Sequence, residues 1–272
     1  MVNVTVVGKN SFMAKAMRED GLGANWQWLS HQDALDHDEW IANTDCLINF
    51  SYAPEMRREP YNESLDTDTK LAQKIKDHDI HYMMLSSRLV YGPQSDAKLV
   101  ETMPPAPQGQ YGMNKNIIEQ SVVGVLGEEK VTRLRLSNIF GFEPNRASFF
   151  GMALTKLKQE NQITYDMSPF TKRDFMSIRH FGKALEAIAQ KPVGGIFNLG
   201  SGIGLETGWI AQWLIEGYGQ GGLYIKDMGI RDVFYLDMDK TRKTFDVPPY
   251  SHSDLKQDCI RCGLQMKEHR DE

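Results

Sequence analysis

The sequence predicts an α/β protein in which a doubly wound parallel sheet is joined to a smaller α+β lobe. Short apolar or β-branched runs alternate with helix-length segments through most of the chain, which is typical of βαβ units. Gly8, Ser51, Ser87 and Asn138 each fall at or just past the end of a predicted strand. Because parallel strands end at one edge, we expect these residues to line one ligand crevice.

The first half of the chain supplies most of this sheet. Residues 2–7 form a buried strand by their length and β-branching, and residues 11–19 have the pattern of a helix. Further strands are predicted at 26–29, 45–50, 81–85 and 131–136, and further helices at 61–78 and 111–126.

The alternation loosens after Phe142, which indicates a second, smaller lobe. A helix at 149–159, a hairpin near 162–170 and an irregular tail after Gly200 are predicted there. Sheet-like order returns with an extended segment at 175–178, a helix at 181–189 and a strand at 196–199. We therefore assign residues 1–142 and 173–202 to the sheet domain, and residues 143–172 and 203–272 to the smaller lobe.

Composition excludes several classes of function. The 272 residues carry a formal net charge of −5, and the densest basic clusters are the pairs Arg57-Arg58 and Lys172-Arg173, which argues against nucleic-acid binding. The apolar opening stops at Gly8, too early for a signal peptide, and no apolar run reaches membrane-spanning length. We expect a soluble cytoplasmic protein.

Three cysteines indicate no disulfide framework. Cys259 and Cys262 form a Cys-x-x-Cys pair flanked by His252 and His269, so a metal site is conceivable. No second pair lies at zinc spacing, and we predict a reduced, chemically idle pair and no metal.

Tyr111 and Lys115 are one helical turn apart, and Ser87 lies 24 residues before the tyrosine. Residues at i and i+4 share a helical face, with Cβ atoms about 5–6 Å apart. The helix begins after the proline-rich residues 104–109, so Tyr111 lies in its first turn, at the positive end of the helix dipole. The dipole and the lysine both favour the phenolate and lower the pKa of this tyrosine, which is ordinarily about 10. With a strand-end hydroxyl at Ser87, the trio predicts proton transfer beside a hydride carrier.

Several segments, in the correct order, resemble the extended short-chain dehydrogenase/reductase family of nucleotide-sugar epimerases, dehydratases and reductases. They are the Ser-Ser-x-x-Val-Tyr-Gly strand end at 86–92, the Tyr-Gly-x-x-Lys at 111–115, the Leu-Arg-x-x-Asn-x-Phe-Gly at 134–141, the Arg-Asp-Phe at 173–175 and the Phe-Asn-Leu-Gly-Ser-Gly at 197–202. The resemblance implies a Rossmann-type dinucleotide-binding domain, a lobe that binds a nucleotide-diphosphate sugar, and a homodimer.

The amino-terminal fingerprint departs from that family's Gly-x-x-Gly-x-x-Gly. Gly8 remains for the tight turn, whereas Ser11 and Ala14 replace the other glycines and are still small. The resemblance nevertheless implies a nicotinamide dinucleotide. Its expected contacts, besides Tyr111 and Lys115, are Gly8, Asn10, Ser11, Phe12, Met13, Ser30, His31, Phe50, Ser51 and Tyr52.

The second strand favours NADP(H) over NAD(H). An acidic residue at its end would hold the adenosine ribose of NAD, but Asp33 comes slightly late. Ser30 and His31 can accommodate a 2′-phosphate, and Lys9 can reach it. NAD(H) stays open, because Ser30 and His31 can also simply start a loop.

Two features narrow the reaction within the family. Sugar dehydratases carry Asp-Glu directly after the catalytic hydroxyl residue, where this chain has Arg88 and Leu89. About 40 residues separate Val7 from Ile48, which leaves little room for the usual third strand of epimerases and resembles the dTDP-4-dehydrorhamnose reductase branch. That branch's Gly-Lys-Thr opening is also similar to Gly8-Lys9-Asn10.

The resemblance therefore implies reduction of the keto group, at carbon 4, of a nucleotide-diphosphate keto-deoxysugar in surface-polysaccharide or deoxysugar biosynthesis. Tyr111 would donate the proton, Lys115 would hold the nicotinamide ribose, and Ser87 would bind the ketone oxygen. The expected substrate contacts are Arg88, Asn138, Ser148, Arg173 and Arg231. A 4-epimerase with tightly bound NAD and a non-catalytic dinucleotide-binding regulatory subunit are the alternatives.

Overall fold

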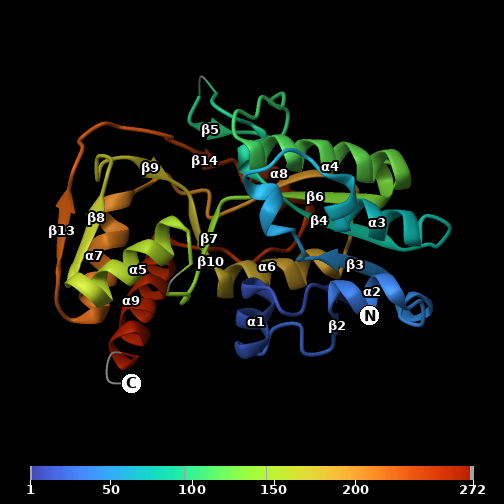
Figure 1. The fold of residues 1–272 in the computed structure, drawn as a ribbon, viewed down its shortest axis with the longest axis horizontal. Coiled ribbons are helices and arrows are strands. Elements are labelled where there is room, and N and C mark those ends of the chain that lie inside the picture. The colour runs from blue at the N-terminus through green and yellow to red at the C-terminus, as the bar shows by residue number, and fades with distance from the viewer. Residues whose placement is uncertain (1, 95, 145, 270–272) are drawn as a thin grey trace.

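A computed structural model describes residues 2–94, 96–144 and 146–269. Its centre is one sheet of six parallel strands in the order β11-β6-β4-β3-β1-β2 (Figure 1). The strands are β1 (Val4–Val7), β2 (Gln27–Leu29), β3 (Cys46–Asn49), β4 (His81–Ser87), β6 (Val131–Leu136) and β11 (Gly195–Leu199). The predicted α/β fold with a doubly wound parallel sheet is confirmed.

Helices cover both faces of the sheet. Helices α1 (Phe12–Glu19) and α6 (Ile178–Ala189) pack on one face, and α2 (His31–Asp36), α3 (Thr67–Ile75) and α4 (Gln110–Leu126) pack on the other. Within β1 the neighbours Val6 and Val7 are both buried, and each belongs to a different one of these two cores. That alternation is the period of two expected for a strand covered on both sides.

The sheet ends at β2, the edge strand next to β1. Between β2 and β3 the chain forms only α2 and the short 3-10 helix η1 (Ile41–Asn43). The short spacing between Val7 and Ile48 is thus explained: β2 is the one strand between β1 and β3, and its connection to β3 is short. The other 3-10 helices are η2 (Pro54–Arg57), η3 (Glu63–Leu65), η4 (Arg88–Val90) and η5 (Glu128–Lys130).

The smaller lobe is mainly helical and lies beyond the carboxyl ends of the central strands (Figure 1). It contains α5 (Phe149–Glu160), α7 (Thr207–Tyr218) and α9 (His252–Glu268). Strand β8 (Gln162–Tyr165) pairs with β13 (Gly222–Ile225) in parallel, so the hairpin predicted near 162–170 is wrong. The irregular tail predicted after Gly200 is also wrong, because α7 and α9 lie there.

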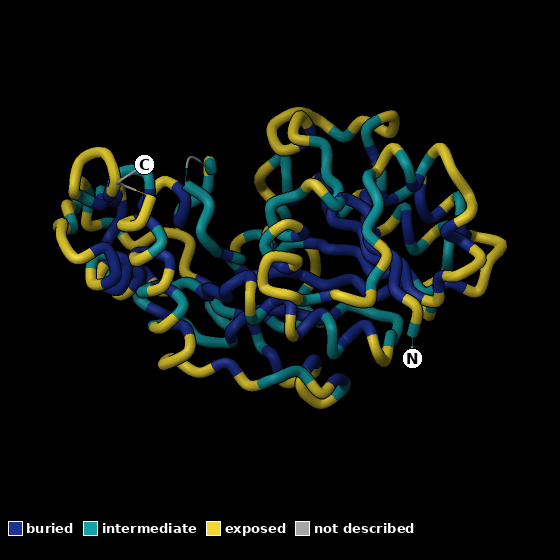
Figure 2. The backbone as a smooth tube through the Cα atoms, turned by 90° about the horizontal axis from the view of Figure 1, so that it is seen from below, coloured by how far each residue is buried: buried dark blue, intermediate teal, exposed yellow. Residues whose placement is uncertain are grey.

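Further short strand pairs lie outside the central sheet. They are β7 (Asn138–Phe140) with β10 (Phe175–Ser177), β9 (Lys172–Arg173) with β12 (Leu205–Glu206), and β5 (Lys98–Leu99) with β14 (Tyr235–Leu236), which is followed by α8 (Asp239–Thr244). One buried cluster contains residues of the sheet, α6, α7 and α9. Figure 2 shows this buried interior surrounded by exposed loops.

Cys259 and Cys262 point into that interior from α9, and burial raises the pKa of the Cys262 thiol to about 12. In the described residues, no three side chains of the metal-binding kind gather together. Among the helices that the structure describes, none combines the length and the apolar character needed to cross a membrane.

Candidate active site

Three connected cavities lie at the carboxyl edge of the central sheet. The edge cavity, next to β2, has a volume of about 520 Å³. The central cavity, of about 330 Å³, shares Ser11, Phe50, Ser51 and Tyr52 with it. The lobe cavity, of about 240 Å³, shares Tyr111 with the central cavity. Tyr111 therefore stands where the last two cavities meet.

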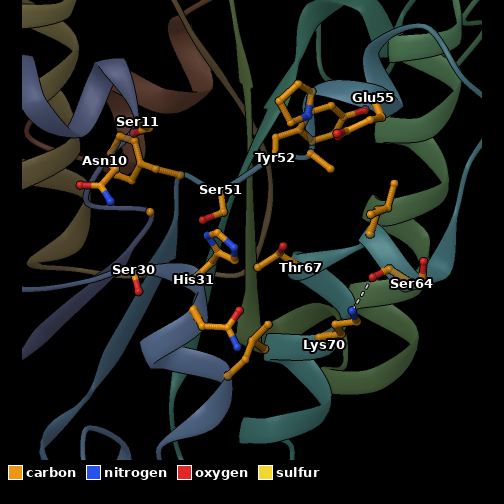
Figure 3. A pocket seen from close by; sticks show the side chains of 17 residues that line it. Asn10, Ser11, Ser30, His31, Ser51, Tyr52, Glu55, Ser64, Thr67 and Lys70 are labelled. Carbon is orange, nitrogen blue, oxygen red and sulfur yellow. Dashed lines mark hydrogen bonds between the residues drawn. The ribbon is translucent and has the colours of Figure 1, made fainter.

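Two strand-to-helix turns form the wall of the edge cavity (Figure 3). Gly8 has φ +96°, and a Cβ atom there would lie 2.8 Å from the Ser51 backbone nitrogen, so only glycine suits the turn. Ser11 caps α1 by accepting a hydrogen bond from the Ala14 N–H, which explains the serine in place of a second glycine. The predicted residues Asn10, Ser30 and His31 also line this cavity.

Asp33, the first carboxylate after the end of β2, is held away from the edge cavity. It forms a capping box with Ser30 at the start of α2, and the Lys9 Nζ lies 3.1 Å from its Oδ2. Hydrogen bonds from Ser30 and then from Lys9 hold the pKa of Asp33 below its usual value. Asp33 is absent from the cavity lining, and Lys9 already has an acidic partner.

The Ser51 hydroxyl is buried and has no hydrogen-bond partner in the described part of the chain, although it borders two cavities. A buried polar group without a partner is costly unless a ligand or water satisfies it. Together with the anion-attracting amino end of α1 at Ser11 and Phe12, this hydroxyl fits the polar middle of a dinucleotide.

Lys115 is 3% exposed and fixed on three sides. Its Nζ donates to the Leu85 carbonyl oxygen at 2.8 Å, lies 3.6 Å from Asp68 Oδ2, and lies 4.5 Å from the centre of the Tyr52 ring. Tyr111 packs edge-on against the same Tyr52 ring at 5.1 Å between centroids. Both predicted residues, Tyr111 and Lys115, border the central cavity.

The two serines at the end of β4 face different surroundings. The Ser86 hydroxyl donates to Glu119, which also pairs with the buried Arg135. Ser87 lines the lobe cavity, and its hydroxyl accepts a hydrogen bond from the Leu89 N–H at 3.2 Å. Ser87 thus both caps η4 and offers a hydroxyl beside Tyr111.

The predicted substrate residues separate into two groups. Asn138 and Ser148 line the lobe cavity, and Ser148 caps α5. Arg88, Arg173 and Arg231 are not among the residues that line the three cavities.

A single carboxylate holds two of those arginines. Arg88 forms a two-pronged ion pair with Asp232, at 2.6 Å for each nitrogen–oxygen pair, and stacks on Phe234. Arg173 lies 3.4 Å from Asp232 Oδ2, and burial lowers its pKa. Arg231 instead pairs with Asp227 on the surface.

Sequence reasoning did not identify five charged residues of the cavities, of which Glu55 and Lys70 line the edge cavity. Arg57 and Arg146 line both the central and the lobe cavity, and Glu143, which lies 3.0 Å from Arg146, lines the central one. Burial raises the pKa of Glu143. Their segments carry no motif: Arg57 comes eight residues after the end of β3, and Arg146 comes five residues after the motif that ends at Gly141.

Residues 2–200 match the sequence model of the NAD dependent epimerase/dehydratase family. The low-salt glycan biosynthesis protein Agl12 of Haloferax volcanii is 22% identical over 237 residues, which cover 82% of this chain and 76% of that protein.

Similar solved structures include RMD from Pseudomonas aeruginosa complexed with NADPH (TM-score 0.81, 20% identity, 99% of this chain and 100% of that one). The NAD-dependent NDP-hexosamine 5,6-dehydratase TunA has a TM-score of 0.78 at 17% identity, with 100% of each chain covered. The UDP-N-acetylglucosamine 4-epimerase from Bacillus cereus has a TM-score of 0.77 at 17% identity, with 98% and 100% covered. At these identities the likeness is one of fold.

Proposed function

Because this chain belongs to the NAD dependent epimerase/dehydratase family, we propose that it reduces the keto group of a nucleotide-diphosphate keto-deoxysugar, at carbon 4, with a nicotinamide dinucleotide. The nucleotide-sugar class is supported by the names of similar proteins, which act on an NDP-hexosamine and on UDP-N-acetylglucosamine. The name of Agl12, a glycan biosynthesis protein, supports a place in surface-polysaccharide or deoxysugar synthesis.

One observation favours hydride transfer, as in reduction or epimerisation, over dehydration: the described residues that line the lobe cavity supply hydroxyl groups but no second acid or base. No aspartate, glutamate, histidine or cysteine is among the described residues that line it. Elimination of water needs such a pair, and Leu89 stands in the lining while Arg88 is turned toward Asp232. Hydride transfer with one proton donor needs only Tyr111.

We assign a role to each residue from the cavity that it borders. Tyr111 donates a proton to the oxygen of the reacting carbon, because its side chain borders both the central and the lobe cavity. Ser87 holds that oxygen by a hydrogen bond, which stabilises developing negative charge. Lys115, which borders the central cavity with Tyr111, holds the nicotinamide ribose. The nicotinamide cofactor, when bound, supplies the hydride.

The cofactor lies, in this proposal, along the edge and central cavities. Gly8, Asn10, Ser11, Phe12 and Met13 approach its diphosphate, and Phe50, Ser51 and Tyr52 line the middle of its path. The 2′-phosphate of NADP(H) suits the edge cavity, because its rim at Ser30, His31 and Gln32 has no carboxylate and Lys70 lies opposite. We therefore favour NADP(H) over NAD(H).

Asn138 and Ser148 bind the sugar nucleotide in the lobe cavity, and Arg57 and Arg146 add positive charge for its diphosphate. Arg173 and Arg88 would reach the diphosphate only after leaving Asp232. Arg231, on the surface, is the least direct of the proposed contacts.

Release of any bound dinucleotide from the purified protein tests this proposal against a 4-epimerase. A reductase exchanges its cofactor and consumes one NADPH for each ketosugar reduced, measured as loss of absorbance. Stoichiometric NAD that stays bound, with sugar turnover and no net NADPH consumption, would establish the epimerase instead. A protein that binds NADPH but turns over no member of a panel of UDP-, GDP-, CDP- and dTDP-ketosugars would be a binding subunit.

A further inference from the structure

A buried carboxylate, Asp68, stands directly behind the active-site lysine. It lies in the first turn of α3 and is 2% exposed. Its Oδ2 is 3.6 Å from Lys115 Nζ, and its Oδ1 accepts hydrogen bonds from Asn49 Nδ2 at 2.8 Å and from the Tyr82 hydroxyl at 2.7 Å. Three strands and helices, α3, β3 and β4, thus hold this carboxylate against α4.

The charges around Asp68 leave Lys115 as its partner. Among the described residues, Lys115 is the one cation within ion-pair distance of it. Asp66, the neighbouring acid, caps α3 and accepts hydrogen bonds from Tyr61 and Thr69. Tyr82 and Tyr52 are the other titratable groups that face it, and burial raises the pKa of each hydroxyl.

Opposite effects act on the Asp68 carboxyl. Burial raises the pKa of this carboxyl above its usual value, and the charge of Asp66 adds to the rise, whereas Lys115 and the hydrogen bonds from Asn49 and Tyr82 offset part of it. A buried ammonium without a carboxylate would itself lose its proton easily. Removing one partner of such a buried ion pair leaves the other charge uncompensated, so each group stabilises the charged form of the other.

Asn49 connects this pair to the cofactor path. Its Nδ2 donates to Asp68, and its Oδ1 accepts from the Ser51 N–H at 2.8 Å. Ser51 is the residue whose buried hydroxyl borders the edge and central cavities. The carboxylate is therefore built into the wall that faces the ligand.

We propose that Asp68 is a positioning residue, which keeps Lys115 protonated and aimed at the central cavity and so sets the upper pH limit for cofactor binding. The proposal rests on the proposed function, in which Lys115 holds the nicotinamide ribose. Asp68 itself touches neither cofactor nor substrate, because it lines none of the three cavities.

The test measures the dissociation constant of NADPH by fluorescence as a function of pH, for the wild type and for Asp68→Asn. The amide keeps the size of the side chain and an acceptor for Tyr82 but removes the charge. We define the alkaline limit as the pH at which the affinity for NADPH has fallen tenfold from its value at neutral pH. We expect both proteins to bind NADPH similarly near neutral pH, and the alkaline limit of the variant to lie about one unit or more below that of the wild type. Tyr82→Phe, which spares the carboxylate, is the matched control and keeps the wild-type limit.

Lys115→Arg in the Asp68→Asn background gives a sharper readout, because a guanidinium does not lose its proton. The alkaline loss of affinity should disappear in that double variant. A merely structural defect would lower the affinity of Asp68→Asn for NADPH at every pH, and this loss would persist in the double variant. Identical alkaline limits for the wild type and Asp68→Asn would overturn the inference while leaving the reductase intact. A wild type that binds no dinucleotide would overturn the proposed function first.

Should Asp68→Asn fail to fold, the stability of the pair remains measurable. Lys115→Met leaves Asp68 alone in the interior, and Asp68→Asn added to it removes the charge. We expect the double variant to melt several degrees above Lys115→Met, which corresponds to about 1 kcal/mol or more for a domain of this size. Equal melting temperatures would contradict the pairing.

Discussion

At the scale of single residues, two adjacent serines at the end of β4 have different roles: one stabilises the packing of α4, and the other is a proposed contact of the substrate. Ser86 borders the central and lobe cavities, but its hydroxyl donates to Glu119, the partner of Arg135, whereas Ser87 lines the lobe cavity together with Tyr111. The alternation of side chains along a strand explains the difference between adjacent serines. Ser86 fixes α4 against the sheet, so the tyrosine on that helix keeps its place opposite Ser87.

Tyr111→Phe removes the proposed proton donor and little else. The ring keeps its contact with Tyr52, so we expect normal folding and NADPH binding. The rate of ketosugar reduction should fall at least about 10²-fold, the usual size of a general-acid contribution. Tyr224→Phe, at an exposed position on β13, is the control and should keep the wild-type rate in the same assay. Undiminished turnover in Tyr111→Phe would rule out the mechanism.

Because of His81, we expect the free energy of unfolding to decrease at acidic pH. Burial, followed by the charge of Lys130, lowers the pKa of His81 from 6.5 to about 4. Because the folded pKa lies below the unfolded one, this contribution is fully present above pH 6.5 and is lost as the pH falls toward 4. It amounts to at most about 3 kcal/mol.

Urea unfolding of His81→Gln at several pH values checks this expectation. The variant should lose less free energy of unfolding between neutral pH and about pH 4.5 than the wild type does. Gln120→Ala, on the exposed face of α4, should keep the wild-type acid dependence. An equal acid loss in the His81 variant would mean that other groups cause it.

The placement of site residues was predictable where one helix or one strand end fixes their spacing, and their roles stay predictions. Tyr111, Lys115 and Ser87 border connected cavities because the helical turn and the strand end determine where they lie. Arg57 and Arg146 were missed because loop conformation, which no periodicity encodes, brings them there. The pairing of Arg88 with Asp232 joins residues 144 positions apart and was equally invisible.

At the scale of elements, α7 and α9 cross at two glycines. A Cβ atom on Gly217 would lie 2.1 Å from the Ile260 carbonyl oxygen, and one on Gly263 would lie 2.3 Å from that of Leu214. Gly217→Ala and Gly263→Ala should each destabilise the protein by about 1–3 kcal/mol, because overpacking against backbone exceeds the gain in helix propensity.

Gly124→Ala in α4 is the matched control for this crossing. A Cβ atom there meets nothing within 4 Å, so the helix should gain about 0.5–1 kcal/mol. Chemical denaturation of the three variants measures the contrast. A stabilising effect at Gly217 or Gly263 would show that the helices can separate without cost.

The elements of the sheet were predictable because buried parallel strands are short, apolar and β-branched. The helix predicted at 61–78 is shorter in the structure, since Asp66 caps α3 and η3 precedes it. Helix α9 was missed although Ser251 and Asp254 form a capping box at its start. Helix α7 was missed because the glycines at 217–222, which end it, indicated a loop.

At the scale of the whole molecule, an exposed apolar strip on α4 favours a homodimer. Met113 and Ile117 are each 39% exposed and one turn apart, whereas Val122 is buried in the core. We expect Met113→Glu combined with Ile117→Glu to give a folded monomer, measured by light scattering. Met152→Glu on α5, also at an exposed methionine, should leave the mass unchanged. A monomeric wild type would contradict the proposed dimer.

The overall α/β architecture followed from strand–helix alternation, and the short sheet followed from the number of residues between Val7 and Ile48. The form of the lobe did not, because β8 and β13 are far apart in sequence and their pairing depends on long-range packing. The division into two domains remains a prediction. One buried cluster joins the sheet to α7 and α9, so the two parts share an interior.

The three buried thiols give the molecule a built-in chemical reporter. Cys46, Cys259 and Cys262 are all buried, and burial raises the pKa of Cys46 and of Cys262 to about 12. Thiolate is the reactive form, so maleimide should leave the native protein unmodified. Alkylation, counted by mass spectrometry, would then time the opening of the sheet through Cys46 and that of the lobe through the other two, in a single reaction tube.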